Sequence, residues 1–215
     1  MRFKSFIKII SLPLFFILFL LNSNQCSKTQ DVVPIVPIDS TIYYGFVLNE
    51  VLYDPPTDTI EGDANGDGDR DANDDEFVEF VNSSANSLNI SGYKLYDSDR
   101  LAANTPNHEF PTNTVLSPGQ AAVVFGGGTP TGNFGGSLVF AASGQVLNLN
   151  NSGDVLTVKN SNDSTIFIFD ITPLSNNPNE SYTRSPDLSG DFIQHTGLNP
   201  GVLFSPGTKS DGTNF

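Results

Sequence analysis

The chain has 215 residues, of which 38% are hydrophobic and 16% are charged, and its formal net charge is −14. This length suits one domain once any processed segment is removed. The charge excludes a nucleic-acid ligand, because phosphate backbones are bound by clustered Lys and Arg, whereas the basic residues from Lys28 to Lys209 are scattered singly. Divalent cations and cationic surfaces fit this charge better.

Residues 1–25 have the three-part layout of a secretory signal peptide. Basic residues occur only among the first eight of them, the apolar run 9–21 follows, and a polar stretch ends at residue 25. The apolar run is shorter than the roughly 20 residues that a membrane-spanning helix needs. We therefore expect residues 1–25 to be a signal peptide and the remainder to be exported.

Cys26, which is the only cysteine, follows this segment directly. Its position resembles that of the lipid-modified cysteine of a bacterial lipoprotein, although Asn24 and Gln25 replace the usual small residues. An ordinary cleaved signal peptide and an uncleaved short anchor are the alternatives. Residues 26–40 contain two prolines and no hydrophobic period, so we expect a lipid-anchored tether in the cell envelope, at the outer membrane or cell surface.

Residues 41–215 are expected to form one all-β domain, because short aromatic and β-branched runs alternate with turn residues. An antiparallel sandwich is typical of such spacing. The segments 155–159 and 165–170 flank a five-residue loop and predict a hairpin, while 115–116 and 121–125 predict a strand pair around a turn. The tail from residue 171 is expected to wrap over the domain without extending its sheet. The other expected strands are 41–52, 76–81, 88–96 with a bulge at Ser91–Gly92, 138–140 and 145–149.

The segment 63–76 (DANGDGDRDANDDE) has the spacing of a calcium loop. Oxygen-bearing side chains occupy its alternate positions and a glycine its sixth, so the side chains can turn toward one hard cation. Strands flank the segment and Asp74 replaces the usual bidentate Glu, which predicts a calcium-stabilised insertion and not a sensor. A solvated acidic loop is the alternative. The expected ligands are Asp63, Asn65, Asp67, Asp69, Asp71 and Asp74.

The sequence does not indicate an enzyme. His108 and His195 do not stand in a zinc-binding spacing, and no G-x-S-x-G motif occurs. We expect both histidines to be surface or turn residues. Asp187 and Asp191 could form an acid/base pair, but such pairs arise freely in an acidic chain. The alternative is a metal-dependent hydrolase of phosphoesters or glycans that uses the Asp-rich loop.

Several motifs in fixed order resemble the lamin tail domain of bacteria over most of residues 41–207. They are FVLNEVL at 46–52, DEFVEFVN at 75–82, LNISGYKLYD at 88–97, HEFP at 108–111, VLSPGQ at 115–120 and ESYTRSPD at 180–187. The resemblance implies an immunoglobulin-like antiparallel β-sandwich that acts as an accessory interaction module. Its ligand would be a protein or a surface polysaccharide. We also expect Glu79 to accept hydrogen bonds from a neighbouring loop, and Arg184 to pair with a carboxylate near the closing tail.

Overall fold

The computed structural model describes residues 41–58, 60–176 and 178–215. The predicted signal peptide, Cys26 and the predicted tether lie outside the described residues. The described domain is nearly all β, with two main sheets that share one hydrophobic core. The predicted all-β, immunoglobulin-like sandwich is therefore confirmed.

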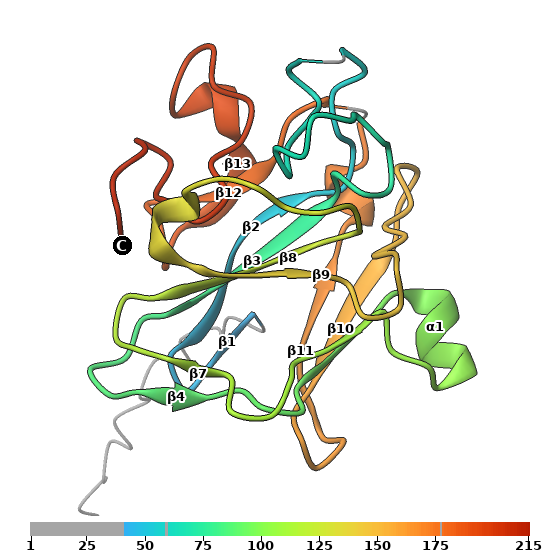
Figure 1. Ribbon diagram of the computed structural model, residues 1–215, viewed down its shortest axis with the longest axis vertical. Coiled ribbons are helices and arrows are strands. Elements are labelled where there is room, and N and C mark those ends of the chain that lie inside the picture. Colours follow the sequence, from blue (N-terminus) through green and yellow to red (C-terminus); the bar gives the residue numbers. More distant parts are fainter. Residues whose placement is uncertain (1–40, 59, 177) are drawn as a thin grey trace, which may run out of the picture. The chain divides into compact units, whose positions relative to one another are not determined.

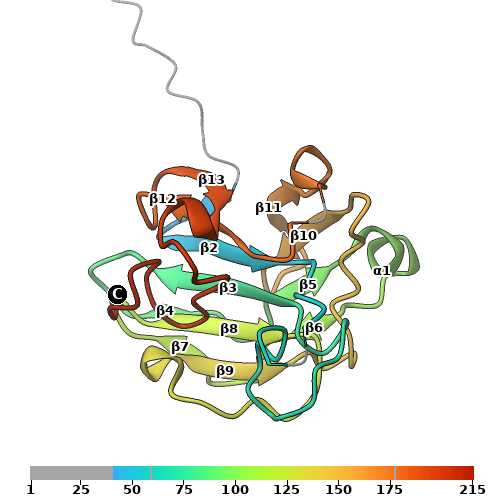
Figure 2. The same ribbon diagram turned by 90° about the horizontal axis from the view of Figure 1, so that it is seen from above.

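The larger sheet has the strand order β13-β12-β2-β3-β8-β9 (Figure 2), with β1 beside β2 (Figure 1). Its pairings are antiparallel except between β8 and β9, which run parallel. Its strands are β1 (Ile42–Tyr43), β2 (Phe46–Leu52), β3 (Phe77–Asn82), β8 (Ala121–Phe125), β9 (Leu138–Ala141), β12 (Tyr182–Ser185) and β13 (Asp191–Gln194).

The smaller sheet has the order β11-β10-β5-β6 (Figure 2). Its strands are β5 (Lys94–Tyr96), β6 (His108–Glu109), β10 (Val155–Lys159) and β11 (Thr165–Asp170). A separate two-stranded ribbon is formed by β4 (Leu88–Asn89) and β7 (Val115–Leu116). Helical structure among the described residues is limited to α1 (Ser98–Ala103) and 3₁₀ turns at Phe134–Gly136, Thr172–Leu174 and His195–Gly197.

The alternation of β3 places its side chains on the two faces of the larger sheet, as predicted. Val78 and Phe80 enter the core between the sheets, where Phe80 stacks on Phe46 with ring centroids 4.7 Å apart. Phe77 lies on the opposite face, in a second cluster with Phe125. Burial of large aromatic side chains on both faces contributes about 1.5–3 kcal/mol per side chain. The larger sheet is therefore a middle layer, covered on its outer face as well.

The expected strand 41–52 is a hairpin, not one strand. Tyr44 and Gly45 have φ values of 49° and 87°, and the register pairs Tyr43 with Phe46. Two consecutive residues with positive φ form the two-residue turn whose twist matches that of antiparallel strands. The chain therefore reverses between β1 and β2.

One further expected strand and one expected pairing are wrong, because the chain moves between sheets. Segment 88–96 is divided between β4 and β5 by a turn in which the N–H of Tyr93 donates to the carbonyl of Ile90 (3.0 Å), instead of containing a simple bulge. The turn at Ser117–Gln120 is present, but β7 pairs with β4, while β8 pairs with β3 and β9. The predicted hairpin of β10 and β11 is confirmed.

Two expectations about the second half of the chain are also wrong. Residues 145–149 form no strand, because Gln145 and Asn148 have positive φ values of 65° and 58°. Asn107 instead donates to the carbonyls of Val146 and Leu147, at 3.2 and 2.8 Å. The tail extends the larger sheet through β12 and β13, and only its last part covers the outer face.

Candidate functional site

The acidic insertion between β2 and β3 is held in shape by Asp75, which sequence reasoning did not select. The Oδ1 atom of Asp75 accepts a hydrogen bond from the N–H of Asn65 (3.0 Å), and its Oδ2 atom accepts one from Asp71 (2.8 Å). Asp75 is fully buried, and this burial raises the pKa of its carboxyl group. One side chain, two residues before β3 begins, thus joins both halves of the loop.

Alternate side chains of the insertion fold back onto its own backbone. The Oδ1 atom of Asn65 accepts from the N–H of Asp67 (2.9 Å), and the Oδ1 atom of Asp67 accepts from Asp69 (3.0 Å). Gly66 and Gly68 have φ values of 71° and 93°, which other residues adopt at a cost. The sequence pattern therefore does produce a tightly curled loop.

Three of the six predicted ligands converge on the glycine-rich segment after β8. A Cβ atom at Gly127 would overlap Oδ1 of Asp74, and one at Gly128 would overlap Oδ2 of Asp67 and Nδ2 of Asn65. The N–H of Thr129 also donates to Oδ2 of Asp67 (2.9 Å). The glycines are thus needed because the loop side chains approach the backbone closely.

The other three predicted ligands lie differently. Asp63 accepts a hydrogen bond from the N–H of Gly68 through Oδ2 (2.9 Å), while its Oδ1 atom is buried without a partner among the described residues. Asp69 and Asp71 have exposed side chains. The pKa of Asp74, which is one of the ligands beside the glycine-rich segment, is raised by partial burial and then by the negative charges of Asp71, Asp67 and Asp69.

The donor set suits a hard cation, although the side chains are not gathered around one point. Within the described residues there is no group of three or more His, Cys, Asp or Glu side chains arranged to hold a metal ion. Carboxylate and amide oxygens are nevertheless the ligands that Ca²⁺ prefers. The buried Oδ1 atom of Asp63, which lacks a donor, is an oxygen that a cation would satisfy.

A second polar cluster is buried on the outer face of the larger sheet, where Glu79 lies opposite Glu50. Glu79 accepts hydrogen bonds from Nδ2 of Asn49 (3.0 Å) and from the N–H of Gly207 (2.6 Å). The expectation of a donor from a neighbouring loop is confirmed by Gly207, whereas Asn49 lies on β2 itself. Burial, and then the charge of Glu50, raise the pKa of Glu79 well above its ordinary value.

Glu50 is held by residues near the end of the described chain. Its carboxylate accepts from the hydroxyls of Ser181 (2.6 Å) and Ser205 (2.8 Å), and from the N–H of Ser205 (2.8 Å). His195 Nε2 lies 2.9 Å from the same Ser205 hydroxyl, and Nδ1 lies 2.9 Å from the Val202 carbonyl. His195 lies in a 3₁₀ turn, but it is fully buried. The expectation that this histidine is a surface residue is therefore wrong.

Arg184 and Asp187 also have structural partners. The guanidinium of Arg184 donates to the carbonyls of Leu48 (2.7 Å) and Gly190 (2.6 Å) and to the hydroxyl of Thr41. Asp187 accepts from the N–H and the hydroxyl of Ser210, at 3.3 and 3.1 Å. These contacts fix the closing tail against β2.

His108 is a core residue and not a surface residue. It is 2% exposed, its Nδ1 atom accepts from the N–H of Ser143 (3.2 Å), and its ring packs edge-on against Phe110. Burial lowers the pKa of His108 to about 4, because an apolar surrounding disfavours the charged form. The side chain is therefore neutral at physiological pH.

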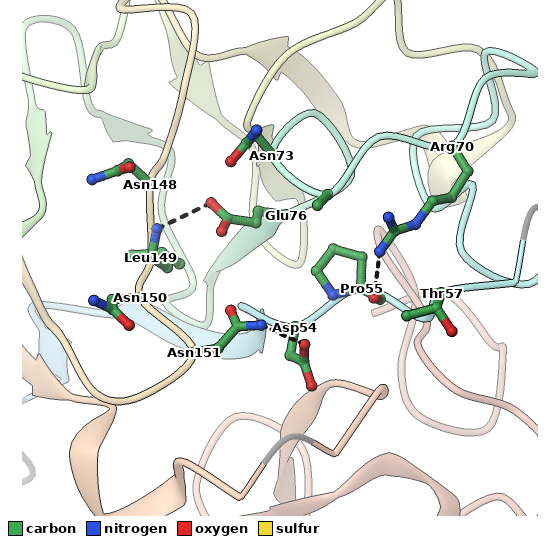
Figure 3. A pocket seen from close by; sticks show the side chains of 11 residues that line it. Asp54, Pro55, Thr57, Arg70, Asn73, Glu76, Asn148, Leu149, Asn150 and Asn151 are labelled. Carbon is green, nitrogen blue, oxygen red and sulfur yellow. Dashed lines mark hydrogen bonds between the residues drawn. The ribbon is translucent and has the colours of Figure 1, made fainter.

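A cavity of about 490 Å³ lies between the acidic insertion and residues 148–151 (Figure 3). Sequence reasoning missed it, because its walls come from distant segments with no common motif. Asp54 accepts from Nδ2 of Asn151 (2.5 Å), and Glu76 accepts from the N–H of Leu149 (3.1 Å). The cavity is lined by Asp54, Pro55, Thr57, Arg70, Ala72, Asn73, Glu76, Asn148, Leu149, Asn150 and Asn151.

A model of the lamin tail domain family matches residues 46–172, which is more than half of the chain. A comparison with curated proteins finds no match. The described part of the chain has no helix with the length and apolar character needed to cross a bilayer. Lamin tail domains are immunoglobulin-like domains without a catalytic role, which agrees with the expectation of a non-enzyme. The motif order, the two-sheet core and the family match together place this chain in the lamin tail domain family.

Proposed function

We propose that the protein is an exported interaction module, anchored in the cell envelope, whose acidic insertion is ordered by calcium. The family match supports the interaction role. The observation that carries the calcium part is the buried Oδ1 atom of Asp63, which has no donor among the described residues although it lies in a loop rich in oxygen ligands. Asp63, Asn65, Asp67, Asp69, Asp71 and Asp74 would supply the ligands.

Electrostatics supports a cation in this loop. The carboxylates of Asp67 and Asp74 both approach the Gly127–Gly128 backbone, so their negative charges are brought close together. Like charges repel strongly at short range, and partial burial strengthens the repulsion. A divalent ion would relieve this repulsion and would also satisfy Asp63. Affinities of extracellular calcium modules are typically about 10⁻⁴ to 10⁻³ M.

Thermal unfolding of residues 41–215 in Ca²⁺ and in EDTA tests the calcium site. A ligand that binds only the folded state stabilises it by about 1.4 kcal/mol at ten times its Kd, so the melting temperature should rise with Ca²⁺ concentration. The variants Asp63→Asn and Asp67→Asn should lose this rise. Asp99→Asn, which changes an exposed carboxylate on α1, should retain it. An unchanged melting temperature at millimolar Ca²⁺ would contradict calcium binding.

The export and anchoring part of the proposal is supported by the sequence of residues 1–26. Acylation also accounts for a single cysteine in an exported protein, where no second thiol exists for a disulfide. Cell fractionation of the full chain should place it with membranes, and Cys26→Ser should release it or leave it unprocessed. Recovery of the intact chain from the cytosol would refute export.

A further inference from the structure

We infer that the cavity between the acidic insertion and residues 148–151 binds a neutral sugar residue of a polysaccharide. The inference rests on the interaction function proposed above and names the ligand class. A volume of about 490 Å³ lies within the roughly 300–1,000 Å³ of small-molecule sites. The cavity therefore has room for one or two sugar rings.

The cavity wall offers hydrogen-bond donors and acceptors side by side. Asn148 and Asn151 use their Nδ2 atoms to donate to Asp97 (2.9 Å) and Asp54 (2.5 Å), which leaves their Oδ1 atoms as acceptors. Asn150 uses Oδ1 to accept from the N–H of Ser152 (2.9 Å), which leaves its Nδ2 group as a donor. Sugar hydroxyls both donate and accept, so this mixture suits them.

The acidic groups of the cavity are already bound by the protein. Asp54 accepts from Asn151 and from the N–H of Asn179 (3.1 Å), and Glu76 accepts from Leu149. These bonds leave the neutral amides as the main groups for a ligand.

The cavity lining disfavours anionic sugars and hydrophobic peptide side chains. Arg70, the one basic residue of the described lining, is fixed in the cavity wall. Its Nε atom donates to the carbonyl of Pro56 (2.7 Å), and its Nη2 atom donates to the carbonyl of Pro55 (2.8 Å; Figure 3). One guanidinium beside two acidic residues does not create a cationic site, so an anionic sugar is disfavoured. Pro55 and Leu149 offer only small apolar surfaces, which suit the C–H faces of a sugar better than a hydrophobic peptide side chain.

The same loop forms the cavity wall and carries the proposed calcium ligands. Arg70 lies between Asp69 and Asp71, and Asn73 precedes Asp74. A cation that fixes these residues fixes the cavity wall at the same time. Calcium and sugar affinities should therefore increase together, because linkage between two sites is reciprocal.

NMR spectroscopy of ¹⁵N-labelled residues 41–215 tests the site, because side-chain amide groups of asparagine are observed directly. The probes are neutral disaccharides of glucose, galactose and N-acetylglucosamine, with galacturonic acid as the anionic comparison. At least one neutral sugar should shift the amide signals of Asn73 and Asn150 saturably. The variants Asn73→Ala and Asn150→Ala should each weaken binding by about tenfold.

Asn162→Ala is the matched control, because this exposed asparagine lies in the loop beyond the other end of β10 and should leave binding unchanged. The inference is overturned if no neutral sugar shifts these signals in Ca²⁺ or EDTA, if the shifts lie elsewhere, or if galacturonic acid binds more tightly. Calcium-dependent melting without sugar binding would refute only the cavity. Equal sugar binding in Ca²⁺ and EDTA, without a rise in melting temperature, would refute only the calcium loop.

Discussion

Glu50 and Glu79 face each other across β2 and β3, and neither side chain has any exposed surface. A bulge between Leu48 and Glu50 shifts the register of β2 and brings Glu50 onto the outer face beside Glu79. Removing a carboxylate from water disfavours its charged form, which is why burial raises the pKa of both groups. The stability of the domain should therefore depend on pH through these residues.

The sign of this dependence follows from the raised pKa of Glu79. The folded protein holds the proton of Glu79 more tightly than the unfolded chain does, in which the pKa of this group is 4.5. The contribution of protonated Glu79 to the free energy of unfolding is complete below about pH 4.5. It is lost as pH rises through the folded pKa, by at most about 1.4 kcal/mol per pH unit for one group. Glu79→Gln should be about 1 kcal/mol less stable than the unsubstituted chain at pH 5, because it loses one acceptor, and the difference should shrink toward pH 8.

Urea unfolding at a series of pH values measures this effect. Glu109→Gln changes an exposed glutamate on β6 and is the control, which should keep the original pH slope. A slope that is the same with and without Glu79 would show that the buried pair does not set the pH dependence.

Sequence reasoning reached Glu79 but not the residues that hold the neighbouring Glu50. A charged residue between apolar neighbours on a strand predicts burial with compensating hydrogen bonds, and this prediction needs only local sequence. His195 and Ser205 could not be found in this way, because they reach Glu50 through tertiary packing. The same holds for His108, whose burial depends on a side chain as distant in sequence as Phe140.

At the scale of elements, the turn between β1 and β2 depends on Gly45. Its φ of 87° is unfavourable for other residues, and a Cβ atom there would lie 2.7 Å from Cβ of Ser84. Gly45→Ala should therefore cost about 1–2 kcal/mol for the backbone conformation and about 1–3 kcal/mol for the contact.

Gly212→Ala provides the comparison for this turn. Gly212 has a similar φ of 81°, but within the described residues no atom beyond its chain neighbours lies within 4 Å of its Cβ position, so the substitution should show the backbone cost alone. Chemical denaturation of both variants separates the two contributions. Equal losses of stability would mean that the contact with Ser84 is relieved at no cost.

Elements with a clear apolar pattern were predicted well, and elements made from polar residues were not. The apolar patterns of residues 76–81 and 121–125 identify β3 and β8, and the turn residues between β10 and β11 identify their hairpin. Strand β12 contains Thr183 and Arg184, whose polar groups are buried by hydrogen bonding instead of by apolar packing. A pattern based on hydrophobicity cannot identify such a strand.

At the scale of the whole molecule, the last part of the chain completes the fold. Residues 203–210 supply Phe204 to the outer apolar cluster and several donors to the buried carboxylates. A chain that ends at Val202 would leave two carboxylates without these donors, and we expect it to lose cooperative unfolding. Removal of residues 211–215 alone should preserve cooperative unfolding, as measured by circular dichroism in urea. A well-folded chain ending at Val202 would contradict this role of the tail.

The sandwich class and the acidic loop were predictable from the sequence, but the cavity was not. Periodicity and oxygen spacing are local properties, so one sequence suffices to identify them. The cavity joins Asp54, Arg70 and Asn150, whose proximity follows from strand order in two sheets. The parallel position of β9 beside β8 is likewise a property of topology and not of local sequence.

The docking of Ser205 onto Glu50 joins positions that are 155 residues apart. Such long-range closure is slow, because the entropy of ordering the intervening chain is lost before any contact compensates for it. Strand β2, which carries Glu50, can therefore gain its last hydrogen-bond donors only after synthesis has passed residue 205. Under the export proposed above, this closing order would keep the chain open for translocation until residue 205 has been made, because the carboxylate of Glu50 lacks its last donors before then.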